Sequence, residues 1–232
     1  MRVRVAVIAL LVGAACCAAG VSIARPARAA THVTIPVIRC PTSFGVAPGR
    51  ITVRRDLTLR GVPASTARLT AYTNTSGYLV GPPHLRCAGV VDADGNSTIQ
   101  AWPSGQAQPG PHSAGAGLAL SVIPACVGCK AEATCHYFPT FWRAVRRIGL
   151  ICRPEPPPGE QLRYLNERLV AFVDPPFVKG AGWPSGAGLS ATGLVGIRPG
   201  ASQVVFTSSC TLPAAQRAVC VDSADAERRL SG

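Results

Sequence analysis

Residues 86–102 read RCAGVV-DADGN-STIQAW, two short runs rich in apolar side chains on either side of a polar turn. Asp94-Gly95 is a strong turn dipeptide, because glycine adopts a positive φ without a steric cost. The stretch therefore predicts a β-hairpin with strands at 86–91 and 97–102.

Alternation of apolar and polar residues predicts more strands outward from this hairpin. Pro36 lies within the alternating stretch 31–38, and this predicts an edge strand because proline has no N–H to donate. Further strands are expected at 51–59, 69–72, 118–123, 169–173, 194–197 and 203–207, and helices at 128–137, at 139–150 and from 213 onward. The predicted fold class is α+β, a mainly antiparallel β-sheet with two or three short helices, stapled by disulfides.

The first 29 residues have the pattern of a secretory signal peptide. Arg2 and Arg4 precede twenty uncharged residues, Val5 to Ala24, and Ala27-Arg28-Ala29 provides small residues before a cleavage site. We expect residues 30–232 to form a single exported, disulfide-rich domain. An uncleaved membrane anchor through residues 5–24 is the alternative.

Eight cysteines remain after the leader, and an even number in an exported chain predicts a disulfide framework. Pairing of Cys210 with Cys220 is the most local choice, and Cys40 with Cys87 would close a longer loop. The central four would then pair among themselves. The disulfide candidates are Cys40, Cys87, Cys126, Cys129, Cys135, Cys152, Cys210 and Cys220.

The chain carries a net charge of +12, and four of its arginines (Arg2, Arg4, Arg25, Arg28) lie in the leader, which leaves about +8 on the mature domain. A basic extracellular surface attracts an anionic cell-wall or membrane-surface component. Solubility alone is the competing explanation. No aromatic residues are interleaved with the arginine clusters, so nucleic acid is not an expected partner.

Cys126-Val127-Gly128-Cys129 has the spacing of a thiol-disulfide oxidoreductase motif at the start of a helix. Against this, Cys135 and Cys152 are nearby partners, no tryptophan precedes the pair, and the preceding chain is not a βαβ unit. Structural disulfides are therefore preferred, with redox catalysis by Cys126 and Cys129 as the alternative. A zinc site would need a second close ligand pair, so neither a metal nor another cofactor is predicted.

Other catalytic patterns are weak. The turn at Asp92-x-Asp94-Gly95 lacks the spacing of an EF-hand, and the chain contains no Gly-x-Ser-x-Gly elbow. A hydrolase would require an acid pair, such as Asp92 with Glu132 or Asp174, in a concave pocket. An enzyme is the less favoured interpretation.

Two segments, 80–118 and 173–189, resemble each other. Val80-x-Pro82-Pro83 is matched by Val173-x-Pro175-Pro176, and Trp-Pro-Ser-Gly follows each, at 102–105 and 183–186. These matches predict a weak internal repeat; coincidence in a chain rich in proline, glycine and alanine is the alternative.

Segment 79–104 resembles uncharacterised exported proteins of high-GC actinobacteria. The resemblance extends to Cys40-Pro41-Thr42-x-Phe44-Gly45 and to Asp174-Pro175-Pro176-x-Val178-Lys179-Gly180. It implies export and disulfides, with no activity to transfer. Taken with the residues, it predicts a non-catalytic protein of the cell envelope or extracellular space that binds an anionic envelope component.

Overall fold

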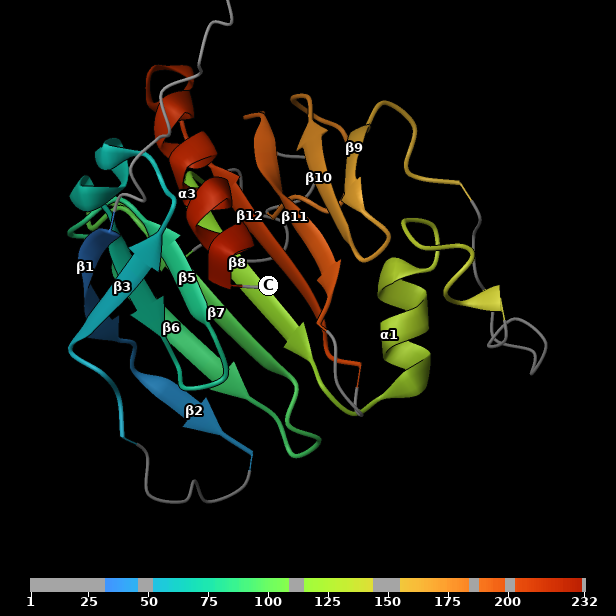
Figure 1. Cartoon of the computed structure of the whole chain (residues 1–232), viewed down its shortest axis with the longest axis horizontal. Helices are drawn as coiled ribbons and strands as arrows, with labels where there is room; N and C mark the ends of the chain where they lie inside the picture. Colours follow the sequence, from blue (N-terminus) through green and yellow to red (C-terminus); the bar gives the residue numbers. More distant parts are fainter. Residues whose placement is uncertain are drawn as a thin grey trace, which may run out of the picture.

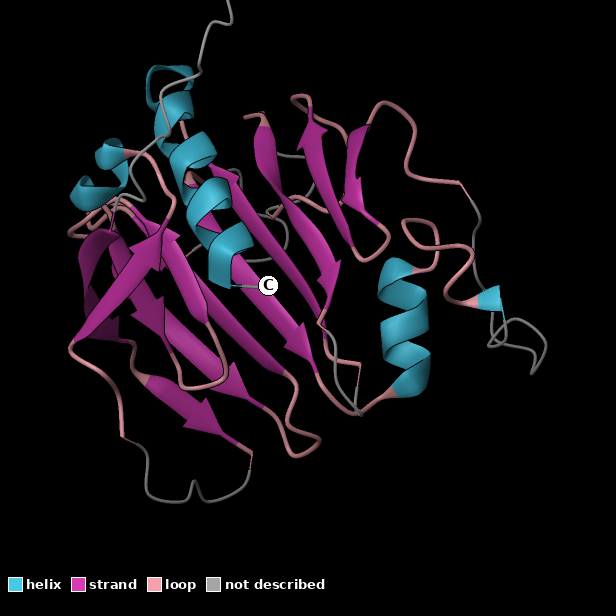
Figure 2. Cartoon of the chain, in the orientation of Figure 1, coloured by secondary structure: helices cyan, strands magenta, loops and turns pink. Residues whose placement is uncertain are grey.

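The computed structural model describes residues 32–45, 52–108, 115–143, 155–183, 188–198 and 203–230. Within these ranges the chain forms twelve strands and two α-helices, and most strand pairs are antiparallel (Figures 1 and 2). The predicted α+β class, with a mainly antiparallel sheet and disulfides, is confirmed.

Eight strands form the larger sheet, in the order β2-β6-β7-β8-β12-β11-β10-β9. Only β2 and β6 are parallel. The predicted hairpin of residues 86–102 is present as β6 and β7, and Gly95 takes a φ of 79° in its turn. The strands are β2 (Thr42–Phe44), β6 (Arg86–Val91), β7 (Ser97–Trp102), β8 (Gly117–Ile123), β9 (Gln161–Asn166), β10 (Leu169–Asp174), β11 (Ala191–Ile197) and β12 (Val205–Thr211).

Four strands form the smaller sheet, in the order β3-β1-β4-β5. They are β1 (His32–Arg39), β3 (Asp56–Arg60), β4 (Thr70–Thr73) and β5 (Tyr78–Gly81). The expectation that Pro36 marks an edge strand is wrong, because β1 has a neighbour on each side. Antiparallel pairing with β3 ends at Pro36 and parallel pairing with β4 begins at Val37, so the proline lies where the ladder changes partner.

The helix α3 (Arg217–Leu230) lies across the larger sheet, between the smaller sheet and strands β9–β11 (Figure 1). The 3-10 turns η1 (Ala64–Arg68) and η2 (Ala214–Gln216) precede β4 and α3. The helix α1 (Val127–Thr134) packs against the opposite face of the larger sheet, where Ala131 belongs to the same buried cluster as Val170 and Val195. The expected helix at 139–150 falls largely outside the described residues.

Three apolar clusters result from this layering in the described residues, one of them on the smaller sheet, where Val33, Ile35 and Val80 pack with Ala226 of α3. On the face that carries α3, Tyr72 and Leu79 of the smaller sheet pack against Ile99, Leu118 and Leu120 of the larger one. On the other face, Tyr137, Phe138 and Trp142 pack with Phe172 and Val205. Strands β9 and β10 lie at the end of the sheet that the smaller sheet does not reach.

The two Pro-Pro segments share a turn geometry. His84 and Phe177 each follow a Pro-Pro pair and have φ values of 64° and 68°. In the second turn Val178 N donates to the Pro175 carbonyl at 3.1 Å. In the first, the Tyr72 hydroxyl donates to the Pro82 carbonyl and accepts from Leu85 N. The two turns thus share a positive φ after the Pro-Pro pair but differ in their hydrogen bonds, and a duplication stays a prediction.

Candidate functional site

Strands β9, β10 and β11 present a partly open apolar face toward α3. Ala171 is directly paired with Arg163 and Leu194, and Val173 with Gln161 and Thr192. Paired residues of neighbouring strands point to the same face of a sheet. Ala171 and Val173 are only half-buried on this face, whereas Val170 and Phe172 on the opposite face are fully buried. The open face forms the floor of a groove.

One face of α3 forms the wall of this groove. Val221, Ala224, Asp225 and Arg228 line it at the three- and four-residue spacing that places side chains on one side of a helix. Val221 is 51% exposed. The groove encloses about 470 Å³, within the size range of sites that hold small molecules.

Two arginines give the groove a cationic rim. Arg163 is exposed on β9 and makes no ion pair within the described residues. Arg228 pairs with Asp225 at 3.4 Å, and its Nε is buried without a hydrogen-bond partner in the part of the chain that the structure describes. Arg163 therefore keeps donors that a ligand in the groove can use, and the Arg228 side chain, 39% exposed, lies beside it on the helix wall.

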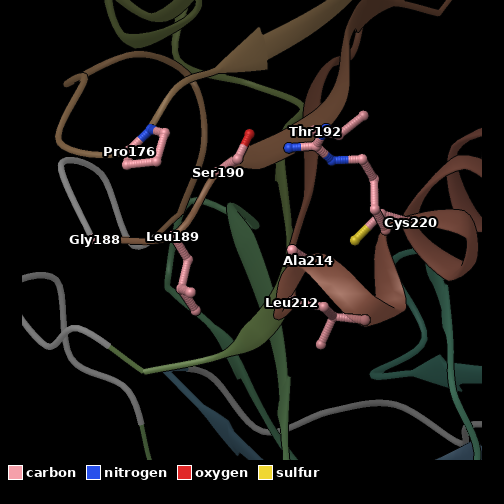
Figure 3. Close-up of a pocket in the computed structure, with 9 residues that line it drawn as sticks. Pro176, Gly188, Leu189, Ser190, Thr192, Leu212, Ala214 and Cys220 are labelled. Carbon is pink, nitrogen blue, oxygen red and sulfur yellow. The ribbon is translucent and has the colours of Figure 1, made fainter.

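A second, smaller pocket of about 140 Å³ lies next to the groove, also between α3 and β11. The groove and this pocket together are called the seam below. Thr192 lines both pockets. In Figure 3, Pro176, Gly188 and Leu189 lie across the smaller pocket from Ala214 and Cys220. Arg217 also lines it, and eleven residues of helix, about 16 Å, separate Arg217 from Arg228. The seam thus has an arginine toward each end.

Phe177 lies at the rim of the smaller pocket and is 77% exposed. A Cβ on Gly188, which lines the pocket, would stand 3.4 Å from the Phe177 ring. The φ of 68° at Phe177 is a left-handed conformation that a bulky residue rarely adopts. An exposed aromatic side chain held in this conformation suggests a role in binding.

The disulfides confirm the two pairings expected from spacing, Cys40–Cys87 and Cys210–Cys220. On loop-closure entropy these contribute about 4 and about 3 kcal/mol. A third disulfide joins Cys126 to Cys129, and Cys135 is also disulfide-bonded. Cys152 lies outside the described residues. Disulfides of this kind are typical of proteins outside the cytoplasm.

The Cys126–Cys129 disulfide lies at the amino end of α1. Cys126 is the N-cap residue, and its Sγ accepts a hydrogen bond from the backbone N–H of Cys129 at 3.1 Å. Cys129 is exposed and Cys126 is half-buried. The bond closes a four-residue loop and contributes about 2 kcal/mol by the same entropy argument, the least of the three.

Asp174 and Glu160 form a buried carboxyl pair that the sequence did not predict. Burial raises the pKa of Asp174, and the neighbouring Glu160 carboxyl raises it further. Gly180 lies directly over both, because a Cβ there would overlap the two carboxyl groups. Of the acid partners expected for Asp174, Asp92 accepts from Asp94 N and Asn96 N in the hairpin turn instead.

Hydrogen-bond donors surround this carboxyl pair. Tyr137 Oη and Ala181 N donate to Glu160 Oε1 at 2.9 and 2.8 Å, and Gly182 N donates to Asp174 Oδ2 at 2.6 Å. Burial and the Glu160 charge raise the pKa of Tyr137. Glu160 Oε2 and Asp174 Oδ1 have no donor among the described residues, and the Asp174 carboxyl group, whose pKa is raised, donates to Glu160 when it is protonated. Neither of the two pockets includes these residues. The bonds from Ala181 N and Gly182 N tie the 175–182 turn to the carboxyl pair.

The described residues hold no group of three side chains suited to a metal ion. In the same part of the chain, no helix has the length and apolar content of a membrane span. Trp102, in the first Trp-Pro-Ser-Gly segment, is buried at 4% exposure and packs inside the fold.

The groove could not be recognised from local sequence, because its floor combines residues 163, 171 and 194, which only strand pairing brings together. One signal was available: Arg217, Cys220, Ala224 and Arg228 recur at helical spacing.

Fold and site together define a disulfide-stabilised α+β domain with a groove between one helix and an open sheet face. Comparison of the chain with protein-family models, curated proteins and solved structures finds no match.

Proposed function

We propose that this protein is an exported binding protein that holds an anionic, single-chain amphiphile in the groove between α3 and strands β9–β11. The observation that carries the proposal is an apolar floor, with Ala171 and Val173 half-exposed, beside the guanidinium groups of Arg163 and Arg228. An acyl chain fits the floor, and a carboxylate fits the arginines, whose planar donors match its geometry.

Export is part of the same proposal. The leader at 1–29 and the resemblance to exported actinobacterial proteins support it, as do the disulfides. A groove that carries an amphiphile between membrane and wall, or shields it there, suits a chain with a basic surface.

The seam supports an elongated ligand over a compact one. The two pockets meet at Thr192, so a chain that starts between Arg163 and Arg228 can extend past Thr192 toward Leu189 and Leu212. Phe177 stands at that end as an exposed apolar contact. The ligand's head group thus lies near β9 and its tail near the Cys210–Cys220 disulfide.

The test is displacement of a fluorescent long-chain carboxylate from the mature protein with its disulfides intact. Unlabelled palmitate should displace it, and palmitate methyl ester and the C16 amine should be at least about tenfold weaker. Arg163→Gln and Arg228→Gln should each weaken carboxylate binding about tenfold, which corresponds to about 1.4 kcal/mol.

Arg39→Gln is the matched control, because Arg39 is an exposed arginine at the end of β1, outside both pockets. It should bind like the native protein. Equal displacement by all three amphiphiles would reject the proposal. If Arg39→Gln weakened binding as much as the groove variants, diffuse surface charge would be the cause and the groove would not be the site.

A further inference from the structure

Among the three disulfides that the structure places, Cys126–Cys129 is the one most open to solvent. Cys40, Cys210 and Cys220 are between 1% and 3% exposed and Cys87 is half-buried, whereas Cys129 is exposed and its partner Cys126 is half-buried. A thiolate attacks a disulfide along a line through both sulfur atoms, so access to one sulfur decides whether exchange occurs. Of these three disulfides, Cys126–Cys129 is the one that contains an exposed cysteine, Cys129.

The surroundings of Cys126 stabilise it as a leaving group. Its Sγ already accepts the Cys129 N–H at 3.1 Å, at the end of α1 where backbone N–H groups concentrate partial positive charge. Lys130 adds an ammonium group, which donates to the Pro124 carbonyl at 3.0 Å two residues before Cys126. Both features favour a thiolate at this position.

An exposed apolar side chain stands between the two cysteines in the sequence. Val127 is 52% exposed and follows Cys126 directly, so a polypeptide approaching the disulfide meets an apolar side chain beside it. The two sulfurs also lie on α1, which packs on the opposite face of the larger sheet from α3 and the groove. The disulfide is therefore separate from the proposed ligand site.

We infer that Cys126–Cys129 is a redox-active disulfide that oxidises a cysteine pair of another exported polypeptide. A substrate thiolate attacks the exposed Sγ of Cys129, a mixed disulfide forms, and Cys126 leaves as a thiolate held by the Cys129 N–H. The second substrate thiolate then attacks the substrate sulfur of the mixed disulfide and releases Cys129. The substrate dithiol becomes a disulfide by losing two electrons and two protons, and the protein gains them as two thiols.

The reverse exchange with a low-molecular-weight disulfide outside the cytoplasm restores the Cys126–Cys129 bond. The direction of attack is specific: the mixed disulfide forms on Cys129, the second cysteine of the motif, because Cys126 is the more enclosed and the better stabilised sulfur.

The experiment is a single turnover of the oxidised mature protein with an equimolar reduced peptide that contains two cysteines. Acid quenching, alkylation and peptide mapping should show two new alkylatable thiols at Cys126 and Cys129, equal loss of peptide thiols, and an intermediate mixed disulfide on Cys129. Cys40–Cys87 and Cys210–Cys220 should stay closed, and circular dichroism should remain native.

The control is the double variant Cys126→Ser/Cys129→Ser, which should fold, bind the fluorescent carboxylate normally, and oxidise no peptide. Lys130→Gln should slow the exchange several-fold. The inference fails if Cys126–Cys129 opens only on denaturation, if another disulfide opens first, or if the double variant oxidises the peptide as fast as the native protein. Because carboxylate binding is measured separately, failure here leaves the proposed function unaffected.

Discussion

The backbone N–H of Val80 donates a hydrogen bond of 3.0 Å to the carboxyl group of Glu227, a residue 147 positions further along the chain. Val80 lies on β5, the outer strand of the smaller sheet, and Glu227 lies on α3, which forms the groove wall. Glu227 is 6% exposed, and burial raises its pKa to about 7. One buried carboxyl group thus fixes the helix against a strand edge.

Replacing Glu227 tests this link. Glu227→Ala leaves the Val80 N–H buried without an acceptor, which costs about 1–3 kcal/mol in addition to lost packing. Glu227→Gln keeps an acceptor oxygen and should lose less than about 1 kcal/mol. Urea unfolding at pH 7 measures both; equal stability of the alanine variant and the native protein would show that the hydrogen bond contributes nothing.

Stability should fall as pH rises from about 4.5 to above 7. The folded protein holds a proton on Glu227 to about pH 7, whereas the unfolded chain releases it near 4.5, so the folded state binds more protons in this window and loses stability as they leave. The Glu227 contribution is about 3 kcal/mol, and the raised pKa of Asp174 acts in the same direction. Thermal melts across this range check the sign, and in Glu227→Gln the slope should be smaller.

Asp174→Asn should stabilise the protein at alkaline pH. The asparagine oxygen still accepts from Gly182 N, and its amide replaces the proton between residues 174 and 160 with a permanent donor. At pH 8 we expect a gain of about 1 kcal/mol, and at pH 5 little change. A lower Tm at both pH values would contradict the hydrogen bond from the protonated Asp174 carboxyl group.

Phe177→Gly should separate stability from binding. Glycine adopts the φ of 68° without strain, so the free energy of unfolding should stay unchanged or rise by up to about 1 kcal/mol. Affinity for the fluorescent carboxylate should fall several-fold, since the apolar contact at the rim is lost. The matched control is His84→Gly, at the equivalent turn outside both pockets, which should leave binding unchanged.

Filling the groove floor should block the ligand. Ala171→Phe adds a ring where Ala171 is half-buried against Val221 and Leu194, which line the same groove. Carboxylate binding should fall below detection while the Tm changes by only a few degrees. A variant that folds and still binds would place the ligand elsewhere.

The parts of the fold that sequence predicted are those set by local chemistry. Asp94-Gly95 determines a hairpin wherever the hairpin lies in the sheet, and cysteine spacing alone singled out Cys210 with Cys220. The position of Pro36 was misjudged because the rule assumes one partner strand along the whole of β1, whereas β1 changes partner at that residue.

The functional sites were harder to predict from the sequence than the strands were. Glu160 follows a proline-rich connector and has no neighbouring acid, so only the fold brings it to Asp174. Tyr137 appeared to be an ordinary helix residue, and its hydroxyl donates across 23 residues to Glu160. The cysteine pair Cys126 and Cys129 was visible from the start, but its mutual bonding depends on how Cys135 is used, and spacing does not decide that.

Strand β12 lies in the interior of the larger sheet, between β8 and β11, although it follows every other strand in the chain. While the chain emerges from its amino end, the eight-stranded sheet stays split into two halves, β2-β6-β7-β8 and β11-β10-β9, until residues 205–211 have emerged. Both halves then expose unpaired edges that invite association with other chains. A chaperone that holds the emerging chain would have its greatest effect in this interval, and a stop codon before residue 205 would yield two unjoined half-sheets in place of a shortened domain.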